Sequence, residues 1–327
     1  MNGIEQLLPL AVSFEEFTDI GFWTSVGVLA GTYTIFALGL QINVGYTGVI
    51  NFGQVGFAAL GAYTMAILVT DAGFSFWLSL PIAVLVTIMF GLIIGLPALR
   101  LRADYFAITT IAAAEAIRFT ALNARDLTGG SQGMLGFSDD WDVVSDRIEI
   151  WLEWLGWSNP ETLFPLLIVV WAVAVVAAAG LTVLQRTPWG RVLRAIREDE
   201  DAARALGKNV FVYKLQSLSI AATLGAISGF FIALNLNFIN PDVFQPLVTF
   251  LGYAVLILGG LASYWGVAVG AILFWTVLEG LRYLELPFED SEIAAIRFIL
   301  VGITLILLMA FRPQGIFGKR EEMVLGE

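Results

Sequence analysis

The stretch FSFWLSLPIAVLVTIMFGLIIGLPAL, residues 74–99, contains no charged side chain. A helix needs about 20 predominantly apolar residues to cross the hydrocarbon core of a bilayer, so this stretch is long enough for one crossing. Similar runs recur along the chain of 327 residues, of which 58% are hydrophobic and 14% charged, with a mean hydropathy of +0.82. We therefore expect an all-α, polytopic membrane protein that forms a single membrane domain over residues 1–327.

The apolar runs predict about nine membrane spans, within a range of eight to ten. They lie at residues 21–41, 48–69, 74–99, 105–122, 162–184, 212–236, 246–262, 264–283 and 293–311. The runs at 246–262 and 264–283 meet at GGLASYWG, residues 259–266. A short or re-entrant span there would change the number of membrane spans.

The basic residues orient these spans, because Lys and Arg collect in cytoplasmic loops. They concentrate at Arg100 and Arg102, in residues 186–214, and in a tail with Arg312, Lys319 and Arg320. Nine spans place all three groups on one side, which we expect to be the cytoplasm. This predicts an external N-terminus, a cytoplasmic C-terminus, an acidic external loop at about residues 123–161 and a cytoplasmic loop at about residues 186–211.

The cytoplasmic loop RTPWGRVLRAIREDEDAARALGKN, residues 186–209, predicts one helix with a signal at each end. Thr187 is placed to cap it, Pro188 to occupy its first position and Gly207 to end it. Its expected pairs at a spacing of four are Arg194 with Glu198, Arg197 with Asp201, and Glu200 with Arg204. Its expected apolar stripe is Val192, Ile196, Ala203 and Leu206.

Two interpretations of this helix stand side by side. It is either a solvated helix on the bilayer surface or a helix that binds another protein. Its acidic run at residues 198–201 favours a protein partner, because the cytoplasmic leaflet is itself anionic.

The second informative stretch is QINVGYTGVINFGQVGFAALGAYT, residues 41–64, in which amides alternate with glycines. Irregular backbone at membrane depth is tolerated only where it is buried in protein or lines a wet cavity. A translocation pathway and plain helix packing both fit this pattern. The spacings of small residues at 91 and 95, 225 and 229, and 266 and 270 favour packing.

Ionisable residues inside predicted spans indicate function by default. Glu115 and Arg118 are three apart on one helix face and are expected to pair, as are Glu279 and Arg282, while Arg297 enters the last span. The long side chains of Arg282 and Arg297 can also reach the interface. We expect the pair of Glu115 and Arg118, near Thr109 and Thr110, to border the pathway or to stabilise the core.

An enzymatic function is not expected. The string GGSQG, residues 129–133, matches the G-x-S-x-G pattern, but the chain has no histidine for a Ser-His-Asp triad. It also has no cysteine and no G-x-x-x-x-G-K-[ST] loop, so we expect no catalytic residue, no metal site and no cofactor bound by this chain. The chain is therefore not expected to hydrolyse ATP itself.

Several segments carry a family resemblance. DAARALG, residues 201–207, resembles the Glu-Ala-Ala, three residues, Gly signature of the coupling loop of ABC-importer permeases. The loop as a whole is similar to that of permeases for branched-chain amino acids, specifically the M-type subunit of the pair. Similar pieces follow in family order at residues 39–68, 99–119, 127–134, 258–271 and 311–318. Two departures remain: Asp201 replaces the Glu, and the downstream Ile and Leu-Pro are not at the family spacing.

The resemblance implies a permease subunit of an ATP-driven importer in the inner membrane of a prokaryotic cell. Its implied partners are a second homologous permease, two ABC ATPase subunits, an external substrate-binding protein and the lipid bilayer, with no nucleic acid. The alternatives are a urea or short-amide ABC permease and an ion-coupled secondary transporter.

The candidate residues fall into two sets. The set that the resemblance implies for ATPase docking is Gly190, Arg191, Arg194, Ile196, Arg197, Glu198, Asp201, Ala202, Ala203 and Gly207. The candidates for the translocation pathway are Asn43, Gly45, Gly48, Asn51, Gln54, Thr109, Thr110, Glu115 and Arg118.

Overall fold

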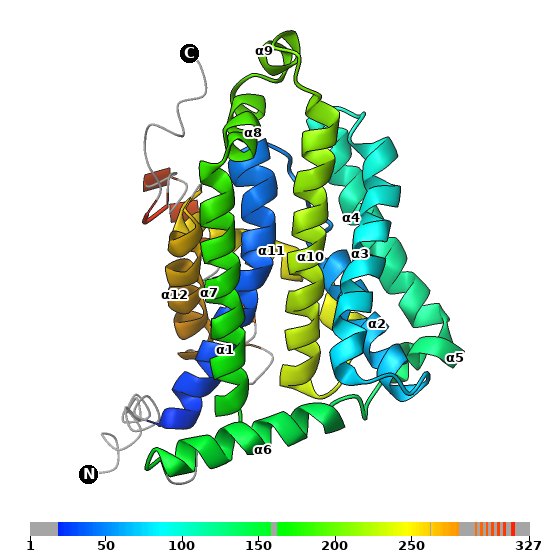
Figure 1. Ribbon diagram of the computed structural model, residues 1–327, viewed down its shortest axis with the longest axis vertical. Helices are drawn as coiled ribbons and strands as arrows, with labels where there is room; N and C mark the ends of the chain where they lie inside the picture. Colours follow the sequence, from blue (N-terminus) through cyan, green and yellow to red (C-terminus); the bar gives the residue numbers. More distant parts are fainter. Residues whose placement is uncertain are drawn as a thin grey trace, which may run out of the picture.

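The computed structural model describes residues 19–157, 162–261 and 263–280, and then positions 292, 295, 296, 299, 302, 303, 306, 307, 310, 311 and 315–317. Within these residues the fold is helical (Figure 1). In chain order the elements are α1 (Ile20–Leu40), η3 (Gln41–Thr47), α2 (Gln54–Thr70), α3 (Phe76–Ala98), α4 (Ala103–Asn123), α5 (Arg125–Thr128), η4 (Gly130–Gln132), α6 (Asp139–Trp154), α7 (Phe164–Arg186), α8 (Pro188–Glu198), α9 (Glu200–Ala205), α10 (Val210–Leu236), η5 (Pro241–Phe244), α11 (Leu247–Gly259) and α12 (Tyr264–Gly280).

The long helices form a bundle with different structures at its two ends. Figure 1 shows α1, α7, α10 and α12 running along the long axis, with α2 and α3 beside α10 and α4 packed against α2 and α3. The short helices α8 and α9 lie at one end of the bundle, and α6 lies across the other. The two segments predicted as loops on opposite sides therefore lie at opposite ends, and which end faces the cytoplasm stays a prediction.

Among the described residues, five helical stretches are long and apolar enough to cross a membrane. They are Ile20–Thr47, Phe76–Ala98, Ala103–Asn123, Phe164–Arg186 and Val210–Leu236. A sixth is reached if α11 and α12, which are bent by 114° at their junction, count together. The protein is thus an all-α polytopic membrane protein. The count of nine stays a prediction, because about half of the positions in the span predicted at 293–311, Arg297 among them, lie outside the described residues. Arg282, Arg312, Lys319 and Arg320 lie outside them as well.

The predicted second span, residues 48–69, begins too early. The helix α2 starts at Gln54 and has 17 residues, because the chain leaves the preceding helical stretch at Gly48, whose φ of 72° is in the left-handed region. Residues 48–53 are therefore not helical but return into the bundle as irregular backbone.

Glycines let α2 and α10 approach backbone to backbone. A Cβ added at Gly229 of α10 would overlap the carbonyl oxygen of Ala58, and one added at Gly61 of α2 would overlap that of Ala226. Contacts of this kind replace side-chain interdigitation by direct packing of the two main chains. The packing interpretation of the glycines at 225 and 229 is confirmed.

The helix α6 is a finding that the sequence pattern did not indicate, since residues 123–161 were expected as a loop. Ser138 precedes the helix, and the side chain of Asp140 accepts a 3.0 Å hydrogen bond from the backbone nitrogen of Phe76 at the start of α3. Trp151 and Trp154, which are 68% and 79% exposed, leave an apolar surface on α6. Tryptophans of this kind are typical of membrane–water interfaces.

Candidate functional site

The site begins where the first membrane helix changes its winding. Residues 41–47 form a π-helix that continues α1 and ends at Gly48. The hydroxyl of Thr47 donates to the Oγ of Ser217 on α10 at 2.8 Å, and that Oγ donates to the Oδ1 of Asn43 at 2.9 Å. Short π-helical segments are frequent at functional sites. Here polar side chains hold the π-helical segment against α10.

Two buried amides support the irregular backbone that follows. The Oδ1 of Asn51 accepts from the backbone nitrogen of Gly53 at 2.9 Å, and the Nε2 of Gln54 donates to the carbonyl of Ala221 on α10 at 2.9 Å. The hydroxyl of Tyr253 on α11 donates to the backbone carbonyl of Asn51 at 2.9 Å. Polar groups at membrane depth need such partners. Asn51 and Gln54 therefore hold the break between η3 and α2, and their place in a pathway stays a prediction.

The two threonines of α4 face different surroundings. The Oγ1 of Thr110, which is buried, accepts from the backbone nitrogen of Phe52 at 3.1 Å and donates to the carbonyl of Ala107 at 2.8 Å. The hydroxyl of Thr109 donates to its own helix, to the carbonyl of Tyr105 at 2.7 Å. Of this pair, Thr110 is the one with a hydrogen bond to the broken backbone.

The predicted pairing of Glu115 and Arg118 is confirmed. The Nε of Arg118 lies 3.0 Å from Oε1 and its Nη2 2.9 Å from Oε2 of Glu115. The Nη1 of Arg118 lies 3.6 Å from the Oδ1 of Asp242 on η5. The side chain of Arg118 is only 15% exposed, so this arginine links α4 to η5 from a mostly buried position.

The exposed helix at the other end is two helices, not one. Thr187 and Pro188 occupy the N-cap and first positions of α8 as predicted, but the hydroxyl of Thr187 donates to the carbonyl of Leu184 and makes no cap hydrogen bond. Gly207, with a φ of 77°, follows α9. The chain becomes extended at Asp199, whose side chain then caps α9 by accepting from the backbone nitrogens of Asp201 and Ala202, each at 2.9 Å. Aspartate favours such a cap over a helix interior, which explains the break.

This break changes the predicted ion pairs. Glu200 and Arg204 pair within α9 as predicted. The predicted pair of Arg197 and Asp201 is wrong, because the two residues lie on different helices: Arg204 pairs with Asp201 at 3.2 Å. Arg194 donates at 3.3 Å to the carbonyl of Gln185, and no ion pair to Glu198 is found among the described residues.

The residues predicted to dock the ATPase divide by burial. Gly190, Ile196 and Ala203 are buried, so they pack the short helices onto the bundle. The exposed members are Arg191, Arg194, Glu198, Asp201, Ala202 and Gly207. Leu206 was expected in the apolar stripe but is 78% exposed. Leu206 and these exposed residues are accessible on α8 and α9. In the sequence, the position of Leu206 directly before Gly207 was the signal that it lies near this surface.

Two polar links join the short helices to the bundle. The Nη1 of Arg197 on α8 donates to the carbonyl of Gly45 in η3 at 2.5 Å. The Nζ of Lys214 on α10 pairs with the Oε2 of Glu200 on α9 at 2.5 Å. Charge-assisted hydrogen bonds are stronger than neutral ones, so a displacement of α8 and α9 acts on both η3 and α10.

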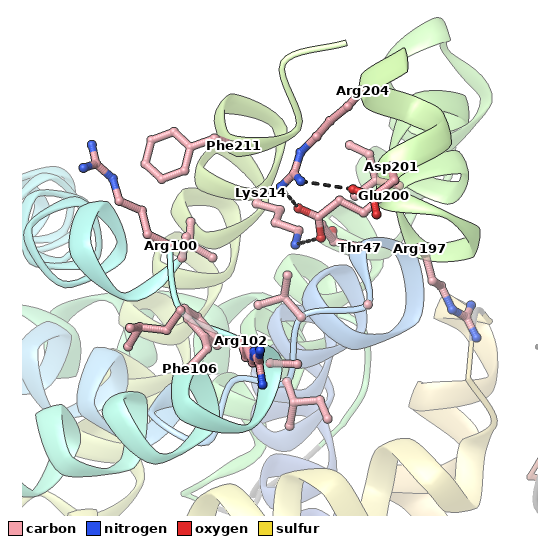
Figure 2. Close-up of a pocket in the computed structure, with 17 residues that line it drawn as sticks. Thr47, Arg100, Arg102, Phe106, Arg197, Glu200, Asp201, Arg204, Phe211 and Lys214 are labelled. Atoms are coloured by element: carbon pink, nitrogen blue, oxygen red, sulfur yellow. Dashed lines mark hydrogen bonds and ion pairs between the residues drawn. The ribbon is translucent and has the colours of Figure 1, made fainter. Parts of the chain in front are cut away.

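A cavity of about 660 Å3 adjoins these links. Figure 2 shows its lining, which comes from the connections η3–α2 and α3–α4, from α8–α9 and from the start of α10. Its charged lining residues are Arg100, Arg102, Arg197, Glu200, Asp201, Arg204 and Lys214. Of the candidate pathway residues, Gly48 lines this cavity.

The described residues contain no group of three or more Asp or Glu placed to hold a metal ion.

Comparison with known proteins places this chain in a family. Residues 23–309 match the family model described as "Branched-chain amino acid transport system / permease component". The chain is 32% identical to the high-affinity branched-chain amino acid transport system permease protein LivM of Escherichia coli K12, over 95% of this chain and 73% of the relative. It is 27% identical to the probable LivM permease of Methanocaldococcus jannaschii, over 89% and 91%.

Similarity extends to the other permease type of these systems. The chain is 24% identical to the permease protein LivH of Escherichia coli K12, over 90% of this chain and 93% of the relative. No solved structure matches the chain.

Proposed function

Since the chain belongs to the family of branched-chain amino acid transport permease components, we propose that it is a permease subunit of an ATP-driven ABC importer. It forms half of a translocation pathway for branched-chain or other small amino acids. It is a transport subunit and not an enzyme, and separate subunits hydrolyse the ATP that drives transport.

The observation that carries the proposal is the pair of links from α8 and α9 into the bundle. Arg197 contacts the π-helical segment through Gly45, and Glu200 contacts α10 through Lys214. A partner that moves the exposed surface around Asp201 and Leu206 therefore acts on the break in the first span. This supports a coupling role for α8 and α9, in which a small free-energy gap between two conformations is biased by partner contacts.

The proposed assembly contains a second homologous permease, two ABC ATPase subunits and an external substrate-binding protein in the inner membrane of a prokaryotic cell. Relatives named LivM and LivH both resemble this chain, which supports a paired permease. In this assembly α8 and α9 face the cytoplasm and α6 faces outward.

An ion-coupled secondary transporter is the competing transport mechanism, because broken helices also bind coupling ions in such carriers. A secondary carrier has no need for two exposed short helices, α8 and α9, that are hydrogen-bonded to the break in the first span. A urea or short-amide ABC permease remains the alternative for the solute.

The test is uptake into vesicles that contain the complete assembly. We expect uptake to require lumenal ATP and the added binding protein and to continue after sodium and proton gradients are collapsed. Uptake that needs an ion gradient and proceeds without ATP would favour the secondary carrier. Comparing leucine with urea as the solute separates the two ABC alternatives.

A further inference from the structure

The cavity beside the short helices carries a surplus of positive charge that the proposed coupling role does not explain. Five cations and two carboxylates line it. Both carboxylates are already paired, Glu200 with Arg204 and Lys214 and Asp201 with Arg204. The lining therefore keeps a surplus of positive charge, in a chain whose net charge is -11.

Arg102 is the cation available to a ligand. It is exposed and forms no ion pair with any residue in the part of the chain that the structure describes. Figure 2 shows its guanidinium among the lining residues, whereas that of Arg100 lies at their outer edge, beside Phe211. Arg100 instead lies over the ring of Phe211, 5.7 Å from its centroid.

Apart from Thr47 and Gly48, the uncharged lining residues are apolar, which is unusual for a site that takes only a small inorganic anion. Ile50 and Leu101 are 36% and 48% exposed, whereas Phe106, which also lines the cavity, is buried. The volume of about 660 Å3 falls within the range of about 300–1,000 Å3 that sites for larger organic ligands occupy. The ligand should therefore carry an anionic group and apolar parts.

The position of the cavity identifies the source of such a ligand. It lies where α3 ends and α4 begins, at the boundary of two helices of membrane-spanning length. Below this boundary Ile93 and Leu96 of α3 are 60% and 46% exposed, one helical turn apart. Apolar surface thus continues from the cavity along the outside of α3, where acyl chains run.

We propose that this cavity binds the phosphodiester headgroup of an anionic phospholipid, with Arg102 as the main cation and acyl chains along α3. Basic pockets between membrane helices bind anionic headgroups in this way. Because Arg197 and Glu200 belong to the same lining, the bound lipid contacts the elements that link α8 and α9 to the bundle. The lipid site does not depend on which solute the permease moves, so it stands or falls separately from the proposed function.

The test is native mass spectrometry of the full-length chain in neutral detergent, titrated with phosphatidylglycerol, phosphatidylcholine or inorganic phosphate. We expect one phosphatidylglycerol to bind in preference to phosphatidylcholine. Arg102→Gln should weaken this binding about fivefold, which corresponds to about 1 kcal/mol for one cation near a membrane surface. Arg102→Lys should largely restore it.

Arg191→Gln is the matched control. Arg191 is an exposed arginine at the same end of the bundle and does not line the cavity, so its replacement should leave lipid binding unchanged. Equal binding by wild type and Arg102→Gln would overturn the proposal. So would displacement of the lipid by millimolar phosphate, which would indicate a site for a free anion. Loss of the lipid on addition of the ATPase subunits would assign the cavity to that partner instead.

Discussion

The guanidinium of Arg197 on α8 donates a 2.5 Å hydrogen bond to the backbone carbonyl of Gly45 inside the π-helical segment. These residues are 152 positions apart in the chain. The bond therefore joins an exposed loop helix directly to the place where the first membrane helix loses regular winding.

Replacing Arg197 by Ala should uncouple transport. Hydrogen bonds to charged groups contribute about 1.5–3 kcal/mol, so we expect uptake per ATP hydrolysed to fall about tenfold or more. Uptake and phosphate release are measured together in vesicles with the full assembly. Arg197→Lys keeps the charge and one donor and should retain part of the coupling, whereas an unchanged ratio in Arg197→Ala would remove Arg197 from the coupling role.

Gly207→Ala should also reduce coupling. Gly207 has open space around it but a φ of 77°, and left-handed backbone costs a residue with a Cβ about 1–2 kcal/mol. The strain alters the end of α9 and should lower uptake per ATP hydrolysed. Gly180→Ala is the matched control, because Gly180 also has open space but lies within α7 with ordinary helical backbone. Similar behaviour of the two variants would count against a role for the end of α9.

Glu115→Ala should destabilise the protein, because it leaves the mostly buried Arg118 with the longer contact to Asp242 and the ring of Phe119. We expect a loss of about 1–3 kcal/mol, seen as a lower midpoint of thermal unfolding in detergent. Glu115→Gln should lose less, since it keeps one acceptor. Normal uptake by folded Glu115→Ala would show that the pair stabilises α4 and η5 and does not border the pathway.

Gly229→Ala should be more harmful than Gly91→Ala. A Cβ at Gly229 overlaps the main chain of Ala58, which cannot move aside without separating α2 from α10, and overpacking costs about 1–3 kcal/mol. A Cβ at Gly91 would lie 3.3 Å from the Cβ of Ala222, which requires a shift of tenths of an ångström. Thermal unfolding of both variants tests the ranking, and equal midpoints would contradict it.

Asp142→Asn should stabilise the protein at neutral pH. Partial burial, with the negative charges of Asp139 and Asp146, raises the pKa of Asp142. The folded state therefore binds this proton more tightly than the unfolded state, so the penalty is present above the raised pKa and disappears as the pH falls through it. The difference in unfolding midpoint between variant and wild type should narrow on acidification. A constant difference from neutral to acidic pH would show that titration of Asp142 is not its cause.

The sequence predicted much of the helical framework, because long apolar runs have one solution in a bilayer. The predicted span at 74–99 matches α3 (Phe76–Ala98), and that at 212–236 matches α10 (Val210–Leu236). The break at residues 48–53 was not located, although its glycines and amides were noted. Its position depends on hydrogen bonds that Thr110 and Ala221 accept and Tyr253 donates, and these residues are remote in sequence.

In the candidate site too, features that depend on neighbouring residues were predictable, whereas a feature that depends on tertiary packing was not. The start of α8 at Thr187 and Pro188 and the pair of Glu115 with Arg118 were predictable, because they depend on residues a few positions apart. The interruption at Asp199 has a local cause as well, but helix continuation and capping compete there and the pattern alone did not decide between them. The bond from Arg197 to Gly45 has no local signal, since tertiary packing alone brings these residues together.

The direct backbone packing of α2 and α10 also limits how the molecule can change shape. Where Ala58 meets Gly229 and Gly61 meets Ala226, the main chains of the two helices pack directly against each other, which hinders one helix from sliding past the other. Because α10 starts only a few residues after α9 ends, we expect a displacement of α8 and α9 to move α2 and α10 together as one rigid unit. We therefore expect opening and closing to be relative movements of rigid groups of helices, with solute passage controlled where these groups meet and not by the bending of a single helix.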